Sequence, residues 1–262
     1  MISLDHVGVV GHSIDVIRRN WLEAGFFVTE PEELMALESS SGKRVSLGQH
    51  SCHVILEQGY IELTAVDRPS PSHHLWPWIK PTDSLGIIAL GAADIESVHR
   101  RLLAANVPLG APAQASRPIH YGARRGDALF TWFALGAAST PEALVCFVRN
   151  ERPELIYQPE VQTHPNGAQA LAGVILVADM PQATVERYAM YSSAPAEAIR
   201  PGLWRCPLHS GSIWIGTPAA LADHFGASIE PATNRVPRSV GFIVACRAGA
   251  GSTKHEQIFW FT

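Results

Sequence analysis

The sequence has few charged residues and no strong excess of either sign. Asp, Glu, Lys and Arg make up 17% of its 262 residues, and the formal net charge at pH 7 is −4. This balance gives no field that would attract a polyanion. Hydrophobic residues amount to 47%, which excludes an intrinsically disordered chain. We therefore expect a compact globular protein that binds no nucleic acid.

Cysteine is also scarce, and long apolar runs are missing. The four cysteines form no Cys-x-x-Cys pair, and most lie in apolar stretches, which favours buried thiols in a reducing compartment. No segment approaches the roughly 20 apolar residues of a membrane helix, and the first residues lack the features of a secretory signal. We predict a cytoplasmic protein without membrane contact.

Motifs of nucleophilic and nucleotide chemistry are missing as well. The sequence contains neither Gly-x-Ser-x-Gly nor a P-loop, and none of its cysteines lies in an evident electropositive setting. Histidine, in contrast, occurs 12 times. Imidazole binds metals and transfers protons near neutral pH, so these histidines are the first candidates for a functional site.

The sequence does contain one order of elements that recurs three times. Each copy opens with an apolar strand, at residues 4–10, 85–92 and 171–179, followed by an amphipathic helix at 13–26, 94–107 and 181–191. Further strands are predicted at 26–29, 44–57, 60–66, 129–135, 143–148, 210–217 and 239–246, with another helix at 218–226. Several strands follow each helix, which favours an α+β fold of β-α-β-β-β modules over alternating parallel βαβ units.

Two joints rich in proline separate the copies, at residues 67–81 and 149–167. We place a domain boundary in the second joint. Residues 1–150 would then form a domain of two modules, and residues 151–262 a third, divergent module with a possible partial fourth.

Several segments together resemble the vicinal oxygen chelate superfamily, which includes glyoxalase I, extradiol dioxygenases and bleomycin-resistance proteins. They are LDHVGVV at 4–10, AGFFVTE at 24–30, GQHS at 48–51, YIEL at 60–63, HYGARRGDALFTWF at 120–133 and HPNGA at 164–168. The resemblance is to the glyoxalase-like domain branch and covers about residues 3–178. It implies that paired modules curl into cupped sheets of mixed or antiparallel strands, with a ligand held in the cup.

The resemblance also implies a metal site. Members that use a metal take one ligand from the first strand of a module and another from the last, which are His6 and Glu62 here. Imidazole and carboxylate suit a divalent ion such as Zn, Fe, Mn or Ni, among which the sequence does not distinguish. The second copy offers Gly86 in place of His6, so further ligands must come from His50, His53, His120 or His164, and we assign His50. The alternative is that His6 is a hydrogen-bonded core residue.

Other residues are candidates for substrate binding. The aromatic residues among them are Tyr60, Trp76 and Trp132, and the polar ones are Arg117, His120, Arg124 and His164. Aromatic rings can line a pocket for a planar ligand, and guanidinium groups bind carboxylate or phosphate in a bidentate manner. A solvated turn for the arginines and a backbone-bonding role for His164 are the alternatives.

Taken together, these features predict a small-molecule enzyme of the glyoxalase-like type. With a metal, His6 and Glu62 would be ligands of an isomerase, lyase or dioxygenase acting on a small oxygen-rich or aromatic substrate. Without one, Glu62 would be a general base and His6 would polarise a carbonyl. The alternatives are a metal-free protein that sequesters a ligand and a degenerate module pair that serves to form a homodimer.

Overall fold

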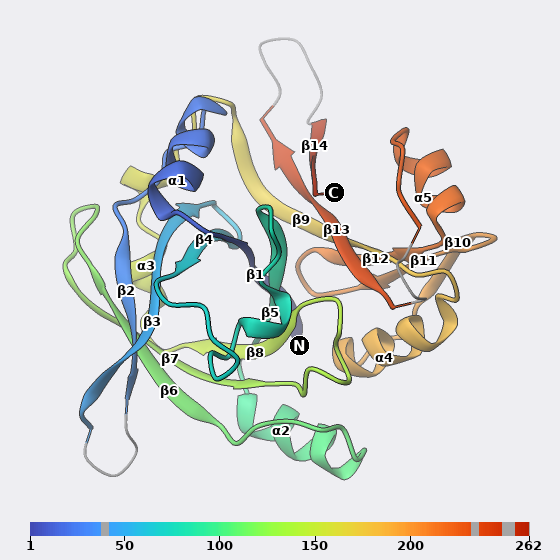
Figure 1. Cartoon of the computed structure of the whole chain (residues 1–262), viewed down its shortest axis with the longest axis horizontal. Helices are drawn as coiled ribbons and strands as arrows, with labels where there is room; N and C mark the ends of the chain where they lie inside the picture. Colours follow the sequence, from blue (N-terminus) through green and yellow to red (C-terminus); the bar gives the residue numbers. More distant parts are fainter. Residues whose placement is uncertain (38–41, 232–235, 248–254, 262) are drawn as a thin grey trace.

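The first two copies of the repeat build a closed barrel. The computed structural model describes residues 1–37, 42–231, 236–247 and 255–261. The first copy contains β1 (Ile2–Gly11), α1 (Ile14–Glu23), β2 (Glu32–Leu37), β3 (Arg44–Ile55) and β4 (Tyr60–Val66). The second contains β5 (Ser84–Ala92), α2 (Ile95–Ala104), β6 (Ala113–Ile119), β7 (Gly126–Ala134) and β8 (Leu144–Asn150). Both copies thus show the predicted order β-α-β-β-β (Figure 1).

The strand order of the barrel is β1-β4-β3-β2-β6-β7-β8-β5. Within each copy the first and last strands run parallel, as β1 and β4 do, and likewise β5 and β8. The two copies join through the antiparallel pairs β1 with β5 and β2 with β6. The mixture of parallel and antiparallel strands confirms the predicted α+β class, and the interior of the barrel corresponds to the predicted cup.

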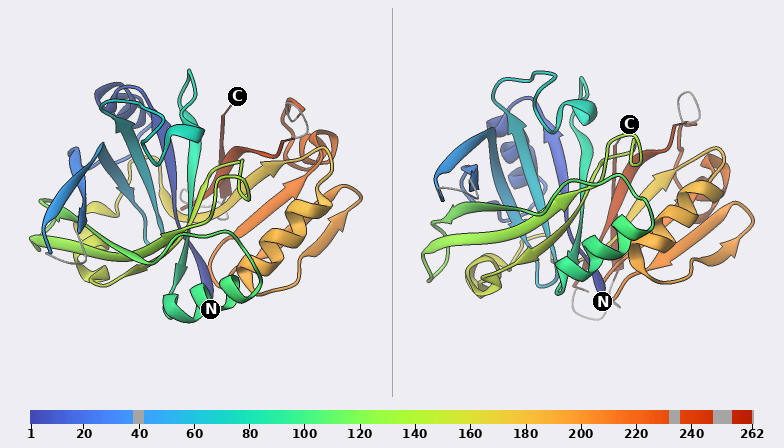
Figure 2. Two further views of the ribbon diagram at one scale, coloured as in Figure 1. Left: turned by 60° about the horizontal axis from the view of Figure 1, so that its bottom comes forward. Right: turned by 90° about the horizontal axis from the view of Figure 1, so that it is seen from below.

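The third copy forms a separate six-stranded sheet of order β10-β11-β12-β9-β13-β14. Its elements are β9 (Ala168–Val177), α4 (Gln182–Ser192), β10 (Glu197–Arg200), β11 (Leu203–Pro207), β12 (Ser212–Gly216), α5 (Pro218–Phe225), β13 (Arg238–Cys246) and β14 (His255–Trp260). The second joint contains the short α3 (Pro153–Ile156) and η2 (Pro159–Val161), and the first joint contains η1 (Trp76–Trp78). This sheet lies beside the barrel, as Figure 2 shows from two sides. The domain division at residue 150 stays a prediction.

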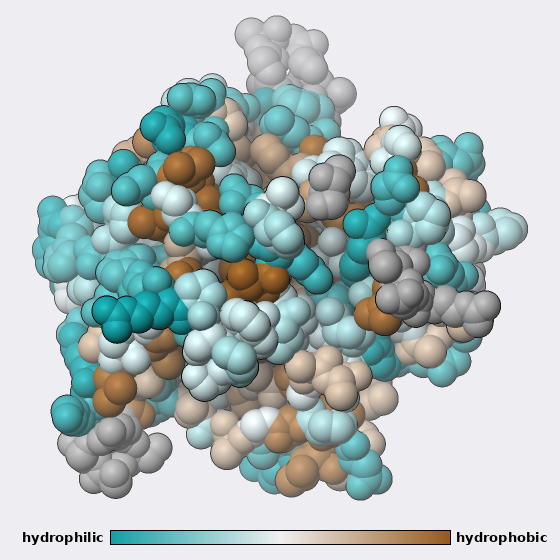
Figure 3. All heavy atoms as spheres, viewed as in Figure 1, coloured by the Kyte–Doolittle hydropathy of each residue, from teal (hydrophilic) through white to brown (hydrophobic). Residues whose placement is uncertain are grey.

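One apolar core joins the barrel to the second sheet. It contains Leu4 and Phe147 from barrel strands together with Val174 and Phe242 from β9 and β13, each at most 1% exposed. On the face drawn in Figure 3, hydrophobic residues are scattered among hydrophilic ones. Within the described part of the chain, no helix is long and apolar enough to cross a membrane.

Several details differ from the sequence prediction, which did not contain the strands β2, β6, β10, β11 and β14. Residues 26–29 are not a strand, although Phe26 and Val28 are buried in the core. Pro31 follows this segment and lacks an amide proton for a sheet ladder, and the strand begins only at Glu32. Strand β6 was missed because its sequence, AQASRPI, has little apolar periodicity. Its place in the barrel is fixed by pairing with β2 and β7.

Helix α2 depends on a side-chain cap. The amide of Ser97 donates a hydrogen bond of 2.9 Å to Oδ1 of Asp94, the residue before the first turn. We expect Asp94→Ala to lower the free energy of unfolding by about 1 kcal/mol, because that amide loses its acceptor. Asp94→Asn keeps an acceptor oxygen and is the matched control in urea denaturation. Equal losses for both variants would contradict the role of the cap.

Candidate functional site

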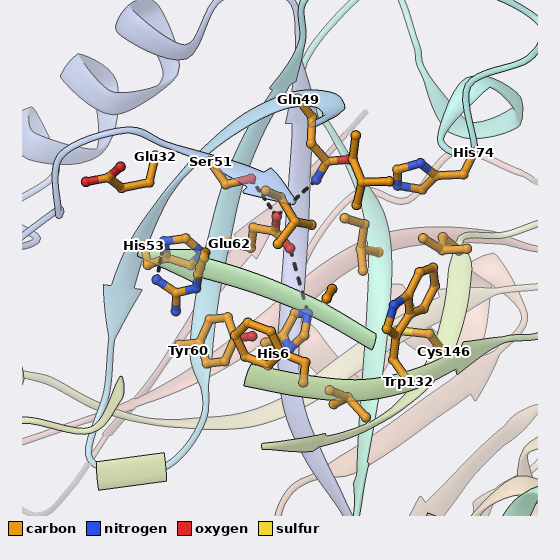
Figure 4. Close-up of a pocket in the computed structure, with 18 residues that line it drawn as sticks. His6, Glu32, Gln49, Ser51, His53, Tyr60, Glu62, His74, Trp132 and Cys146 are labelled. Atoms are coloured by element: carbon orange, nitrogen blue, oxygen red, sulfur yellow. Dashed lines mark hydrogen bonds and ion pairs between the residues drawn. The ribbon is translucent and has the colours of Figure 1, made fainter. Parts of the chain in front are cut away.

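A cavity of about 90 Å³ lies inside the barrel, and every strand of the barrel contributes to its wall (Figure 4). Its polar side chains are His6, Glu32, Gln49, Ser51, His53, Tyr60, Glu62, His74 and Arg117, and the remaining lining is mostly apolar. A water molecule needs roughly 10–15 Å³ on this kind of measure, so the cavity holds several waters or one small ligand.

The alternation of strand β3 decides which of its side chains face the cavity. Gln49, Ser51 and His53 line the cavity, and the residues between them point the other way. His50 is one of those outward residues, and its Nδ1 lies 2.9 Å from Oδ1 of Asp67, with 40% of its side chain exposed. The structure therefore does not bring the predicted third ligand His50 to His6 and Glu62.

His6 is held by a carboxylate from its own strand. Its Nδ1 lies 2.7 Å from Oδ1 of Asp5, and the other oxygen of Asp5 accepts a bond of 2.9 Å from Asn150 Nδ2. Neighbouring residues of a regular strand point to opposite faces, but here Leu4 pairs with Leu90 and His6 with Ala89, so Asp5 is an extra residue in a β-bulge. The bulge turns the Asp5 carboxylate to the His6 ring. As Nδ1–H binds Asp5, Nε2 is left to act toward the cavity.

Glu62 faces His6 across a gap. Its Oε2 lies 3.7 Å from His6 Nε2, which is too long for a direct hydrogen bond. Its Oε1 accepts a bond of 2.6 Å from Ser51 Oγ and a weaker one of 3.5 Å from Gln49 Nε2. Figure 4 shows the His6 ring and the Glu62 carboxylate pointing toward one another, with Ser51 and Gln49 behind the carboxylate. Both groups are thus oriented from behind and have their reactive atoms facing the cavity.

Next to this pair lies a second group around His53. Arg117 Nη1 donates to His53 Nδ1 at 3.3 Å, and the Tyr60 ring stacks on His6 with centroids 4.3 Å apart. Burial lowers the pKa of His53 well below its usual range, helped by the positive charge of Arg117. His53 is therefore neutral and accepts a hydrogen bond. Burial also raises the pKa of Tyr60, which keeps the phenol protonated.

The donor set does not fit a metal ion. Where a partner module would supply ligands, strands β5 and β8 present Ile87, Leu144 and Cys146 to the cavity. Burial raises the pKa of Cys146, so its sulfur is a thiol and not the thiolate that binds metals. Catalytic zinc sites use three protein ligands, but within the described ranges no three His, Cys, Asp or Glu side chains form a group that could hold an ion.

The other predicted binding residues fall into two groups. Tyr60, Arg117 and Trp132 line the cavity. Trp76 is 42% exposed and does not line it. His120 is exposed at the barrel rim, where it forms an ion pair with Glu32. The exposed Arg124 contacts Gln158 through its backbone amide.

His164 joins the second joint to the barrel. Its Nε2 lies 2.9 Å from the carbonyl oxygen of Ile55, and its Nδ1 accepts a bond of 3.1 Å from the amide of Phe27. The ring must therefore carry its proton on Nε2, and burial lowers its pKa. Both ring nitrogens have backbone partners, which leaves no free position for substrate. The structure favours the alternative that His164 fixes the joint.

Five polar residues of the site escaped sequence reasoning: Asp5, Glu32, Gln49, Ser51 and His74. The signal for Gln49 and Ser51 was present, because they alternate with His53 on a strand that pairs with the strand of Glu62. No comparable signal exists for Asp5, because the alternation of a regular strand would point Asp5 to the face away from His6.

Comparison with known proteins agrees with this architecture. The model of the family described as glyoxalase-like domain matches residues 4–191. A hypothetical protein from Staphylococcus aureus superposes with a TM-score of 0.64 at 14% identity, over 83% of this chain and 86% of that chain. A methylmalonyl-CoA epimerase variant from Streptomyces coelicolor, in complex with 2-nitronate-propionyl-CoA, superposes with a TM-score of 0.38. The identity is 16%, over 57% of this chain and 97% of that chain. The chain matches no curated protein.

Proposed function

The chain belongs to the glyoxalase-like domain family of the vicinal oxygen chelate superfamily, and we propose that it is a small-molecule isomerase that works by metal-free proton transfer. One observation carries the proposal. His6 Nε2 and Glu62 Oε2 face each other 3.7 Å apart in the cavity, and each group is held from behind by a side chain that does not reach the gap. Two such groups on one wall suit proton transfer between neighbouring atoms of one substrate.

The chemistry that this pair supports is interconversion of a hydroxy-carbonyl compound through an enediol. Glu62 takes the proton from the carbon that carries the hydroxyl, and protonated His6 gives its Nε2 proton to the carbonyl oxygen. Glu62 then returns its proton to the former carbonyl carbon, and His6 takes the proton of the original hydroxyl. Each group ends as it began, and the carbonyl has moved by one carbon.

The remaining residues of the site support this exchange. Asp5 accepts the Nδ1 proton of His6 and so holds the ring with Nε2 toward the substrate, in the way that a buried carboxylate orients a catalytic histidine. Ser51 holds the carboxylate of Glu62 in place. The apolar wall, which includes Phe130, Trp132 and Leu144, excludes water and so strengthens the electrostatic interactions inside.

Deuterium exchange tests the proposal without knowledge of the natural substrate. The protein is dialysed against a chelator and incubated in D₂O with small hydroxy-carbonyl compounds, and solvent deuterium at carbon is followed by NMR. We expect exchange at the carbon next to the carbonyl, at the same rate before and after chelation. If the compounds bind but are recovered without deuterium, the proposal is wrong and the protein sequesters its ligand. Activity that chelation removes and a divalent ion restores would show a metal enzyme.

A further inference from the structure

A buried guanidinium with an unused donor borders the cavity. Arg117 is 3% exposed, and its Nη2 has no hydrogen-bond partner among the described residues. Its Nη1 donates to the neutral ring of His53, and the faces of Tyr60 and Phe130 lie beside it, each with its centroid 5.8 Å from the guanidinium carbon. In the part of the chain that the structure describes, no carboxylate pairs with Arg117.

A lone buried cation of this kind is costly for the folded protein. Removing a charge from water without a counterion is unfavourable, and cation–π contacts with two rings offset only part of this cost. Arginine is always charged in proteins, so deprotonation gives no relief. The cost falls when an anion enters the cavity, and a carboxylate matches the planar donors of a guanidinium in a bidentate manner.

A second unused group lies on another part of the wall. Gln49 is 1% exposed, and its Oε1 has no hydrogen-bond partner among the described residues, although its Nε2 contacts Glu62 and Thr64. An amide oxygen in this state needs a donor, such as a hydroxyl group. The wall therefore offers one unmet donor and one unmet acceptor, with the His6–Glu62 pair belonging to the same cavity.

We propose that the substrate is a small hydroxy-carbonyl compound that also carries a carboxylate, with the carboxylate bound to Arg117 and the hydroxyl donating to Gln49. This assignment rests on the proposed function, because it names the substrate class of the same cavity. It places the anionic end of the substrate next to His53, which pairs in register with Glu62 across β3 and β4. The carbon that carries the hydroxyl then lies near the proton-transferring pair. Arg117 acts here as a binding residue.

Binding of matched ligands tests the assignment without any turnover. Lactate and mandelate are compared with lactamide and mandelamide, which have the same shape and hydroxyl but no charge, by calorimetric titration of the full chain. We expect the acids to bind at least about tenfold more tightly than their amides, since a hydrogen bond to a charged group contributes roughly 1.5–3 kcal/mol. Equal affinities of acid and amide for the wild-type protein would overturn the proposal.

Variants then locate the contacts. Arg117→Gln should remove the preference for the acids, whereas Arg125→Gln removes the same charge from an exposed residue and should leave it unchanged. Gln49→Leu should weaken lactate at least about threefold and leave propionate, which lacks the hydroxyl, unchanged. If Arg117→Gln fails to fold, the comparison of acid and amide on the wild-type protein still decides.

The two proposals fail separately. Glu62→Gln should bind lactate as tightly as the wild-type protein or more tightly, because it removes a negative charge from the cavity. Selective binding of the acids, without deuterium exchange in any hydroxy-carbonyl compound, would leave the substrate class intact and overturn the isomerase. Exchange of neutral hydroxy-ketones alone, without selective binding of acids, would overturn the substrate class and leave the isomerase intact.

Discussion

Glu62→Gln is expected to lower the rate of deuterium exchange by at least about a hundredfold, since a positioned general base typically contributes 10²–10⁴-fold to a rate. Glutamine keeps the shape of the side chain and can still accept the hydrogen bond from Ser51, but it cannot take a proton from carbon. The loss should appear in kcat, and ligand affinity measured by titration should not fall. NMR exchange rates on the purified variant provide the measurement.

A second carboxylate of the same cavity supplies the control. Glu32 also lines the wall, but its ion pair is with His120 rather than with His6. Glu32→Gln therefore removes the same charge near the cavity and should change the exchange rate by less than about threefold. A similar loss in both variants would mean that the charge of the cavity matters and that no single base operates.

Acidification from about pH 7 to pH 5 is expected to lower the stability of the fold by several kcal/mol. Burial lowers the pKa of His53, His74 and His164 in the folded protein, and His74 falls from 6.5 to about 4, with a further contribution from His73. Between pH 7 and 5 the unfolded chain therefore binds more protons at these histidines than the folded chain does. The stability from each histidine is complete above its unfolded pKa of about 6.5 and is lost as the pH falls below it.

The size of the effect follows from linkage. Each proton that only the unfolded chain binds lowers the free energy of unfolding by up to about 1.36 kcal/mol per pH unit. His74 alone should therefore account for about 2 kcal/mol between pH 7 and 5. Urea denaturation at a series of pH values measures this slope. His74→Gln should flatten it, and the exposed His209, replaced in the same way, serves as the control. If His74→Gln and His209→Gln have equal slopes, His74 is protonated in the fold.

The sequence could predict most of the barrel because its strands carry strong local signals. The apolar runs around His6 and Glu62 lie on β1 and β4, and the parallel pairing of these strands brings the two side chains together. Strand β6, with its AQASRPI sequence, could not be predicted, since neighbouring strands hold it in place more than its own residues do. The same limit applied to the third copy, whose sheet forms by pairing β9 with the distant β12 and β13.

In the candidate site, too, residue type could be predicted from the sequence, but positions that depend on strand pairing could not. Residue types identified Arg117, Tyr60 and Trp132, which do line the cavity. The prediction assigned His50, and not His53, as the third metal ligand. The two side chains must point to opposite faces of the strand, and only the register of β3 against β4 decides which of them faces the cavity. The partner of His6 was missed because Asp5 lies in a bulge, and a bulge depends on how β1 pairs with β5.

The core that joins the two sheets has a consequence for reaction energetics. Strand β1 carries His6 on its cavity side, and on the other side its Leu4 packs in the cluster that includes Val174 and Phe242. Because both of its faces are covered, this strand has little room to relax when the charge of the imidazole changes. Its dipoles are already oriented before the substrate arrives, so the reorganisation that water would require is avoided. The six-stranded sheet, which supplies none of the described residues of the cavity wall, would then contribute to catalysis as a rigid support.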